Sequence, residues 1–361
     1  MAAALTLLVF LVLILSALAD GLYYGATGAL RAGRADLYTF SADSRRQFAR
    51  SSLPAGDAGT IASVPGVAAV GPVGTLQATG RCSGRCPGNL IDLALFGYLP
   101  GHPGGPDRAV EGRLPGAAED GVAAADISLR DDGVRIGDRV TVAGTTVTLR
   151  IVGFTSDSRY LLQPTLWTTI ATWRKVQSQA RPELAGAGDT VQAFAERLRA
   201  GASPATVAAA VDAALGNRTA TVGRRTAVLS LPGVKEQRST LDQIVYATLA
   251  VAGIVTALFF ALITLEKRTQ LAVLKAIGAS NRYLGAGVVV QSLILCALGT
   301  ALGLLFTRLA ALLVPAAVPL SFTAASAATA AVGTFVMGLL GAAFSFRGLA
   351  RIDPATALGG A

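Results

Sequence analysis

The sequence predicts a membrane protein with four transmembrane α-helices and a large extracytoplasmic mixed α/β domain, inserted between the first and second helix. Two features of the composition support this class. Hydrophobic residues make up 52% of the 361 residues and charged residues only 15%, whereas soluble domains average about 25% charged residues. The long stretches without charge lie at the two ends of the chain, and an insert of ordinary polar composition, roughly Asp20–Thr240, separates them.

Three stretches without charged side chains are each long enough for one helix, because about 20 apolar residues cross a hydrocarbon core of roughly 30 Å. They are Ala2–Ala19, Gln243–Leu265 and Tyr283–Thr307. A fourth stretch, Leu309–Phe346, is too long for one crossing and contains Pro315 and Pro319. It therefore predicts the end of the third helix, a loop and a fourth helix.

These spans divide the chain into eight predicted segments. They are a first transmembrane helix and stalk (1–34), an extracytoplasmic α/β domain (35–232), a stalk and second transmembrane helix (233–265), a cytoplasmic segment (266–281), a third transmembrane helix (282–313), an extracytoplasmic loop (314–324), a fourth transmembrane helix (325–346) and a cytoplasmic tail (347–361).

The orientation follows from the basic residues of the short loops. Cytoplasmic loops are enriched in Lys and Arg, and the loop after the second helix carries Lys267, Arg268, Lys275 and Arg282. This loop is therefore predicted in the cytoplasm and the large insert outside, in a multi-pass protein of the cytoplasmic membrane. The remaining positive charge of the net +9 is spread along the chain, so it does not indicate nucleic-acid binding.

The first apolar stretch has an alternative interpretation. A cleaved secretory signal has a shorter apolar core followed by a small-x-small site, and Ala17-Leu18-Ala19 fits that pattern. The length of the run and the lack of a preceding Lys or Arg favour an uncleaved helix.

The outer domain alternates strand and helix patterns. Ala35–Ser41 predicts a strand, Ala55–Ser63 a helix, and Val67–Val73 and Thr75–Thr79 a pair of strands around Gly74. The alternation of apolar and polar residues in 146–154 predicts a half-buried hairpin with 140–142. Further along, the pattern predicts a strand over 189–196, a helix that Ser203 caps and that runs from Pro204 to about Leu215, and a strand over 219–222.

No catalytic pattern stands out. A nucleotide-binding P-loop needs a Gly-Lys pair, and none of the four lysines follows a glycine. No Gly-x-Ser-x-Gly elbow occurs, and the single histidine, His102, lies among Gly and Pro residues that predict a surface loop. We therefore expect a non-enzymatic chain with no cofactor or metal of its own.

The cysteines and one intramembrane charge have structural explanations. Cys82 and Cys86 lie in the outer domain, where a small-loop disulfide is the favoured state, with a free pair and a redox site as alternatives. Cys296, inside the third span, is predicted to pack. Arg308 lies near the outer end of the same helix, where it can reach the interface.

The cytoplasmic loop is the most informative segment. Residues 266–277 place Leu271, Leu274 and Ile277 at helical spacing, with Lys267, Arg268 and Lys275 elsewhere on the surface. This pattern predicts a short amphipathic helix that ends at Gly278, followed by a helix capped by Ser280. A connector with basic anchors is the plain alternative.

The stretch EKRTQLAVLKAIGASNRYL resembles the signature of the FtsX/MacB-type permease family, Glu-x-Arg-x-x-x-x-x-Leu-[Lys/Arg]-Ala-[Leu/Ile]-Gly-Ala-Ser. The matching residues are Glu266, Arg268, Leu274, Lys275, Ala276, Ile277, Gly278, Ala279 and Ser280. The tail RIDPATAL, with Asp353 and Pro354 as a helix start, resembles the family's terminal motif. ASVPGVAAVGPV, EGRLPG and GVRIGDRVTVAG resemble the MacB-like periplasmic core domain, and the layout resembles DevC-type permeases.

The resemblance implies an ATP-driven transporter of the mechanotransmission type. The chain would be the permease subunit, a homodimer whose coupling segment (Glu266, Lys267, Arg268, Leu271, Leu274, Lys275, Ile277, Gly278 and Ser280) docks on a separate cytoplasmic ABC ATPase that binds ATP and magnesium. An extracytoplasmic adaptor or cell-wall protein and membrane lipid are further implied partners. The substrate class is hydrophobic, lipidic or peptide-like.

Three alternatives remain. The chain could be an FtsX-like relay that regulates a cell-wall hydrolase without transport, a permease for lipoprotein release or lipid handling, or a stand-alone receptor. One feature departs from the family pattern, because Met1 leads directly into apolar sequence, whereas family members usually begin with a basic cytoplasmic segment.

Overall fold

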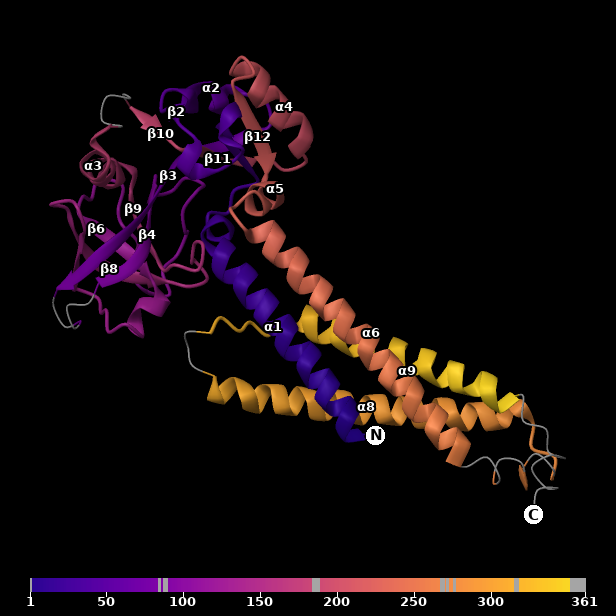
Figure 1. Cartoon of the computed structure of the whole chain (residues 1–361). Helices are drawn as coiled ribbons and strands as arrows, with labels where there is room; N and C mark the ends of the chain where they lie inside the picture. Colours follow the sequence, from indigo (N-terminus) through magenta and orange to yellow (C-terminus); the bar gives the residue numbers. More distant parts are fainter. Residues whose placement is uncertain are drawn as a thin grey trace. The chain divides into compact units, whose positions relative to one another are not determined.

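The computed structural model describes residues 2–83, 86, 90–183, 189–266, 270, 273–274, 277–314 and 318–350 (Figure 1). The chain divides into two compact units. The helical unit comprises Met1–Leu22 with Glu236–Ala361, and the α/β unit comprises Tyr23–Lys235.

Within the described ranges, four helices are long and apolar enough to cross a membrane. They are α1 (Ala2–Ala32), α6 (Val234–Glu266), α8 (Asn281–Leu313) and α9 (Ala324–Ala350). The prediction of four such helices is confirmed. At 1.5 Å per residue, the 33 residues of α6 extend about 50 Å, which is longer than a hydrocarbon core of about 30 Å.

The helices of the helical unit pack closely where glycines face a neighbour. A Cβ on Gly303 of α8 would collide with Val9 of α1, a Cβ on Gly299 would lie only 3.0 Å from Leu5, and a Cβ on Gly338 of α9 would collide with the Cys296 sulfur of α8. Small residues at such crossings bring helix backbones together in membranes. The predicted packing role of Cys296 is confirmed, since its side chain is 1% exposed and belongs to the apolar cluster of this bundle.

A ten-stranded mixed sheet forms the centre of the α/β unit, in the order β12-β1-β11-β3-β4-β9-β6-β8-β5, with β7 pairing β3 and β8. The strands are β1 (Leu37–Ser41), β3 (Val67–Ser83), β4 (Leu90–Tyr98), β5 (Glu111–Gly112), β6 (Val122–Asp126), β7 (Arg139–Val142), β8 (Thr148–Thr155), β9 (Thr165–Thr169), β11 (Ala193–Leu198) and β12 (Thr219–Gly223). A second, two-stranded sheet joins β2 (Leu53–Pro54) to β10 (Thr190–Val191).

Helices and short turns cover this sheet. The helices are α2 (Asp57–Ser63), α3 (Ile170–Ala180), α4 (Pro204–Ala214) and α5 (Arg224–Leu229), and the 3-10 turns are Ala42–Ser44, Phe48–Arg50 and Ile127–Arg130. Figure 1 shows α2 and α4 side by side over the part of the sheet that contains β12, β1, β11 and β3. The apolar core between them includes Leu37, Val70 and Phe194 from the strands and Val207 and Val211 from α4.

The predicted hairpin is confirmed. Strands β7 and β8 pair antiparallel with Val140 opposite Leu149. Leu149 and Ile151 are buried, whereas Thr148 and Arg150 are exposed, because successive side chains of a strand point to opposite faces. The predicted strands over 35–41 and 219–222 and the helix over 55–63 also occur, with ends shifted by a few residues.

Three details of the predicted outer domain are wrong. The two predicted strands around Gly74 form one continuous strand, β3. Gly74 lies within this strand, and a larger residue would not fit there because the Trp173 ring of α3 occupies the space of a Cβ. The strand over 189–196 is interrupted at Gln192, whose side-chain oxygen accepts hydrogen bonds from the Thr75 N–H and hydroxyl. Ser203 precedes α4 as predicted, but its side chain makes no capping hydrogen bond.

Candidate functional site

The segment between α6 and α8 contains a helix end followed directly by a capped helix start. The Ala279 N–H donates to the Leu274 carbonyl at 2.9 Å, which is the six-to-one bond of a Schellman end. Gly278 has φ +101°, a left-handed conformation that glycine adopts without steric cost. The Ser280 hydroxyl accepts from the Tyr283 N–H at 3.2 Å. The predicted roles of Gly278 and Ser280 in the backbone are confirmed.

The apolar side chains of this segment are open to the surroundings. Ile277 is 76% exposed and Leu274 is 39% exposed. Val273 and Tyr283 are exposed as well. Because an exposed group of large apolar residues usually marks an interaction surface, this segment is the candidate docking surface, for lipid or for another protein.

The remaining predicted coupling residues are only partly described. Glu266 is the last residue of α6 and is exposed. Lys267, Arg268, Leu271 and Lys275 lie outside the described residues, as do Asp353 and Pro354 of the tail motif. For this surface, the structure therefore describes the backbone turn at its end and the side chains of Val273, Leu274 and Ile277.

Polar side chains inside the helical unit bond to the backbone of neighbouring helices or of their own helix. Ser292 donates to the Gly338 carbonyl at 3.1 Å, which ties α8 to α9. Thr256, Thr307 and Thr334 each donate to the carbonyl four residues earlier. Arg308 is exposed, and its guanidinium lies 5.9 Å from the centre of the Phe322 ring, a cation–π distance.

The α/β unit holds a fully buried glutamate that the sequence analysis missed. Glu196 of β11 is 0% exposed, and neither carboxyl oxygen has a hydrogen-bond partner among the described residues. Burial raises the pKa of this carboxyl to about 8; the Thr39 hydroxyl nearby opposes that rise and the charge of Asp212 on α4 adds to it. Every second side chain of a strand points to the same face, so Glu196 shares its face with Phe194 and Leu198. This alternation was the sequence pattern from which the burial of Glu196 could have been predicted.

His102 has a structural role in its loop. Its Nδ1 lies 2.9 Å from the Val70 carbonyl, and the residue is exposed. No nucleophile is hydrogen-bonded to this imidazole among the contacts of the described chain, so the geometry offers no catalytic arrangement there.

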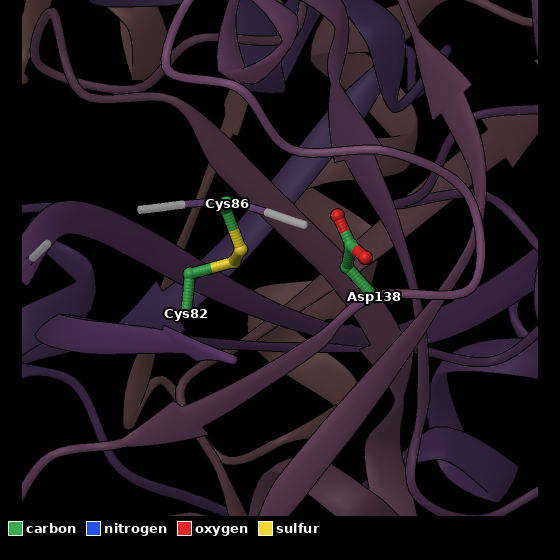
Figure 2. A group of neighbouring side chains, drawn as sticks. All are labelled: Cys82, Cys86 and Asp138. Carbon is green, nitrogen blue, oxygen red and sulfur yellow. A yellow bond between two sulfur atoms is a disulfide. The ribbon is translucent and has the colours of Figure 1, made fainter. Parts of the chain in front are cut away.

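The two cysteines of the α/β unit are joined. Cys82, at the end of β3, and Cys86, in the loop after it, form a disulfide (Figure 2). Both cysteines are buried, and the carboxylate of Asp138 lies beside them. No sequence pattern predicts this third residue, because Asp138 is far from both cysteines along the chain.

The comparisons with known proteins concern both units. Residues 244–354 match the family model of the FtsX-like permease C-terminal region. An uncharacterized ABC transporter permease from Mycobacterium bovis is 29% identical over 319 residues, which are 87% of this chain and 79% of the relative. The provisionally named hemin transport system permease protein HrtB from Staphylococcus epidermidis is 27% identical over 145 residues, 40% of this chain and 41% of the relative.

Among solved structures, the periplasmic region of MacB from Actinobacillus actinomycetemcomitans aligns with 54% of this chain and 91% of that chain. The sequence identity is 14% and the TM-score is 0.40.

Proposed function

Because the chain is a membrane permease of the FtsX-like ABC transporter family, we propose that it couples a separate ATPase to movement of its α/β unit outside the membrane. In this mechanotransmission scheme, closure of two ATPase subunits displaces the segment between α6 and α8, and the helices carry the motion outward. The permease works as a homodimer, with one ATPase on each copy.

One observation carries the proposal. The docking surface of Val273, Leu274 and Ile277 sits directly before a turn whose backbone is fixed by the left-handed Gly278 and the Ser280 cap. A turn held by these backbone contacts directly before α8 would pass a displacement of the docking surface to that helix. The matched family region, residues 244–354, contains this whole segment.

ATP chemistry belongs to the partner in this scheme. The chain has no Gly-Lys pair that could begin a P-loop, so ATP and magnesium would bind to the ATPase. The basic side chains of the loop, Lys267, Arg268 and Lys275, place it on the cytoplasmic side by the positive-inside rule. In this scheme they would pair with acidic residues at the edge of an ATPase groove.

The substrate class that fits best is hydrophobic, lipidic or peptide-like. One relative carries the name of a hemin transport system permease, and hemin is a planar, largely apolar molecule. Hemin and a lipopeptide are therefore the first compounds to test for stimulation of ATP hydrolysis in proteoliposomes. Stimulation without movement of any compound would instead favour an outer cell-wall hydrolase as the target.

The docking surface is tested by Leu274→Glu in the full chain co-expressed with its ATPase. Burying one leucine side chain contributes about 2 kcal/mol, and a carboxylate in an apolar groove adds a desolvation cost. We expect ATPase co-purification and permease-dependent stimulation of hydrolysis to fall by at least roughly tenfold. The measurements are the amount of ATPase retained on the tagged permease and the hydrolysis rate.

The matched control is Leu274→Met, which keeps apolar volume at the same position and should retain association within about twofold. Both variants must reach the membrane at the wild-type level. Normal ATPase association of a well-expressed Leu274→Glu protein would rule out this docking assignment.

A further inference from the structure

Three side chains of metal-ligand type meet in the α/β unit (Figure 2). The ligand atoms of Cys82, Cys86 and Asp138 all lie within 4.8 Å of one another. Each residue is at most 6% exposed. Within the described part of the chain, this is the one group of three or more such residues.

Strand pairing holds two of the three residues, Cys82 and Asp138, together independently of the disulfide. Strands β3 and β7 pair antiparallel, with Cys82 opposite Val140 and Ser83 opposite Arg139. Asp138 directly precedes β7, so the pairing of β7 with β3 places it beside the end of β3, next to Cys82. The sheet register would therefore keep Cys82 and Asp138 adjacent after the sulfur–sulfur bond is broken.

The carboxylate of Asp138 is itself oriented by the turn before β7. Its Oδ2 accepts from the Arg135 N–H at 2.8 Å. Its backbone N–H donates to the Arg135 carbonyl at 3.1 Å, and its carbonyl accepts from the Ile151 N–H at 2.9 Å. A metal site needs ligands that are held by such outer contacts, and this residue has them.

We propose that reduction of the Cys82–Cys86 disulfide converts this cluster into a Zn²⁺ site. An external dithiol supplies two electrons and two protons, so the disulfide becomes two thiols and the dithiol becomes a disulfide. Zn²⁺ then displaces both thiol protons and binds two thiolates and one carboxylate oxygen. A water molecule completes the tetrahedral set that Zn²⁺ prefers.

Charge favours a dication at this place. Two thiolates and one carboxylate oxygen carry negative charge on the atoms that would contact the ion, and a divalent cation balances such a set of ligands. Thiolates select a borderline-soft ion, and the carboxylate favours a divalent ion over a monovalent one. While the disulfide is intact, its sulfurs carry no thiolate charge, and the site does not form. Metal uptake is thus governed by the redox state.

The test uses the full chain in detergent with Cys296 replaced by alanine, so that only Cys82 and Cys86 can supply thiols. The protein is reduced with a phosphine, which leaves no competing thiol, then desalted without oxygen and titrated with Zn²⁺ and with Co²⁺. We expect one metal ion per reduced chain and the thiolate-to-cobalt absorption of a tetrahedral site. The oxidised chain should bind none.

Three variants separate the ligands. Cys82→Ser and Cys86→Ser should abolish uptake, and Asp138→Asn, which keeps the side-chain shape, should weaken Zn²⁺ affinity at least about tenfold. Circular dichroism of each reduced protein checks folding. Equal uptake by the oxidised and reduced Cys296→Ala protein, no uptake by that protein when it is reduced and folded, or unchanged affinity after Asp138→Asn would each overturn the proposal. ATPase association is independent of this test.

Discussion

Two buried carboxylates of the α/β unit differ in how they are accommodated. Asp126 of β6 accepts hydrogen bonds on both oxygens, from the backbone and hydroxyl of Ser128 and of Ser158. Glu196 has no such bonds among the described residues, although the Thr39 hydroxyl and the Asp212 carboxylate of α4 lie near it. A buried carboxyl without partners favours its neutral form, which accounts for its raised pKa.

This difference gives the α/β unit a pH dependence. In the unfolded chain the Glu196 carboxyl has its ordinary pKa of 4.5, and in the folded chain its pKa is about 8. Between these values the folded state binds more protons, so the free energy of unfolding falls as the pH rises from 4.5 to 8 and levels off above.

The variant Glu196→Gln should remove this loss, because glutamine stays neutral. We expect its thermal unfolding temperature in detergent to change little between about pH 5 and about pH 8, while that of the wild type falls. At alkaline pH the variant should be more stable by several kcal/mol, on the order of the shift of the pKa.

The exposed Asp43 supplies the control, since Asp43→Asn should leave the wild-type profile unchanged. Parallel profiles for wild type and Glu196→Gln would show that Glu196 does not titrate in this range.

At the scale of elements, the contact between α1 and α8 depends on two glycines one helical turn apart. Gly299 faces Leu5, and Gly303 faces Val9 and the backbone of Phe10. A Gly-x-x-x-Gly spacing in an apolar helix is a known packing motif. The spacing was visible in the sequence, but only the structure shows which helix lies against it.

A methyl group at this contact should be costly. Gly303→Ala places a Cβ against Val9 and the backbone next to it, and overpacking of this kind typically destabilises by about 1–3 kcal/mol. We expect a lower unfolding temperature of the full chain in detergent than for the wild type.

Gly287, on the same helix, has no atom near the position of a Cβ. Gly287→Ala should therefore be neutral or stabilising by up to about 1 kcal/mol, through the helix propensity of alanine. Equal effects of the two substitutions would mean that α1 does not pack on Gly303.

At the scale of the whole molecule, α1 and α6 contain residues of both units. Residues of α1 up to Leu22 belong to the helical unit and those from Tyr23 to the α/β unit, and α6 changes unit between Lys235 and Glu236. An unbroken helix can transmit force along its axis. In the proposed mechanism, these two helices are the connections through which ATP hydrolysis acts on the α/β unit.

Breaking α6 near this junction should uncouple the units. Thr240 is exposed and its hydroxyl donates to the Glu236 carbonyl at 3.0 Å. Proline there removes a helical hydrogen bond and clashes with the preceding turn, at about 3 kcal/mol. Thr240→Pro should retain ATPase association and lose stimulation of hydrolysis by compounds that act on the α/β unit, whereas Thr240→Ala should retain both.

The comparison is made in proteoliposomes with the ATPase present. A Thr240→Pro protein that still responds to those compounds would contradict transmission through α6, and the docking assignment would be unaffected.

The sequence alone determined the features that depend on local pattern. Runs without charge predicted the four long helices, alternation predicted the hairpin of β7 and β8, and the loop motif predicted both the helix end at Gly278 and the family. These features depend on periodicity, hydropathy and backbone preference, each of which is contained within a short stretch of chain.

Only the tertiary structure decided the features that depend on residues far apart in the chain. It brought Asp138 to the Cys82–Cys86 pair, buried Glu196 completely, placed Trp173 over Gly74 within one long strand, and set α1 against Gly303. Burial and contact arise from the packing of distant segments, and the chemistry of a buried carboxyl or a thiol pair changes with the neighbours that packing supplies.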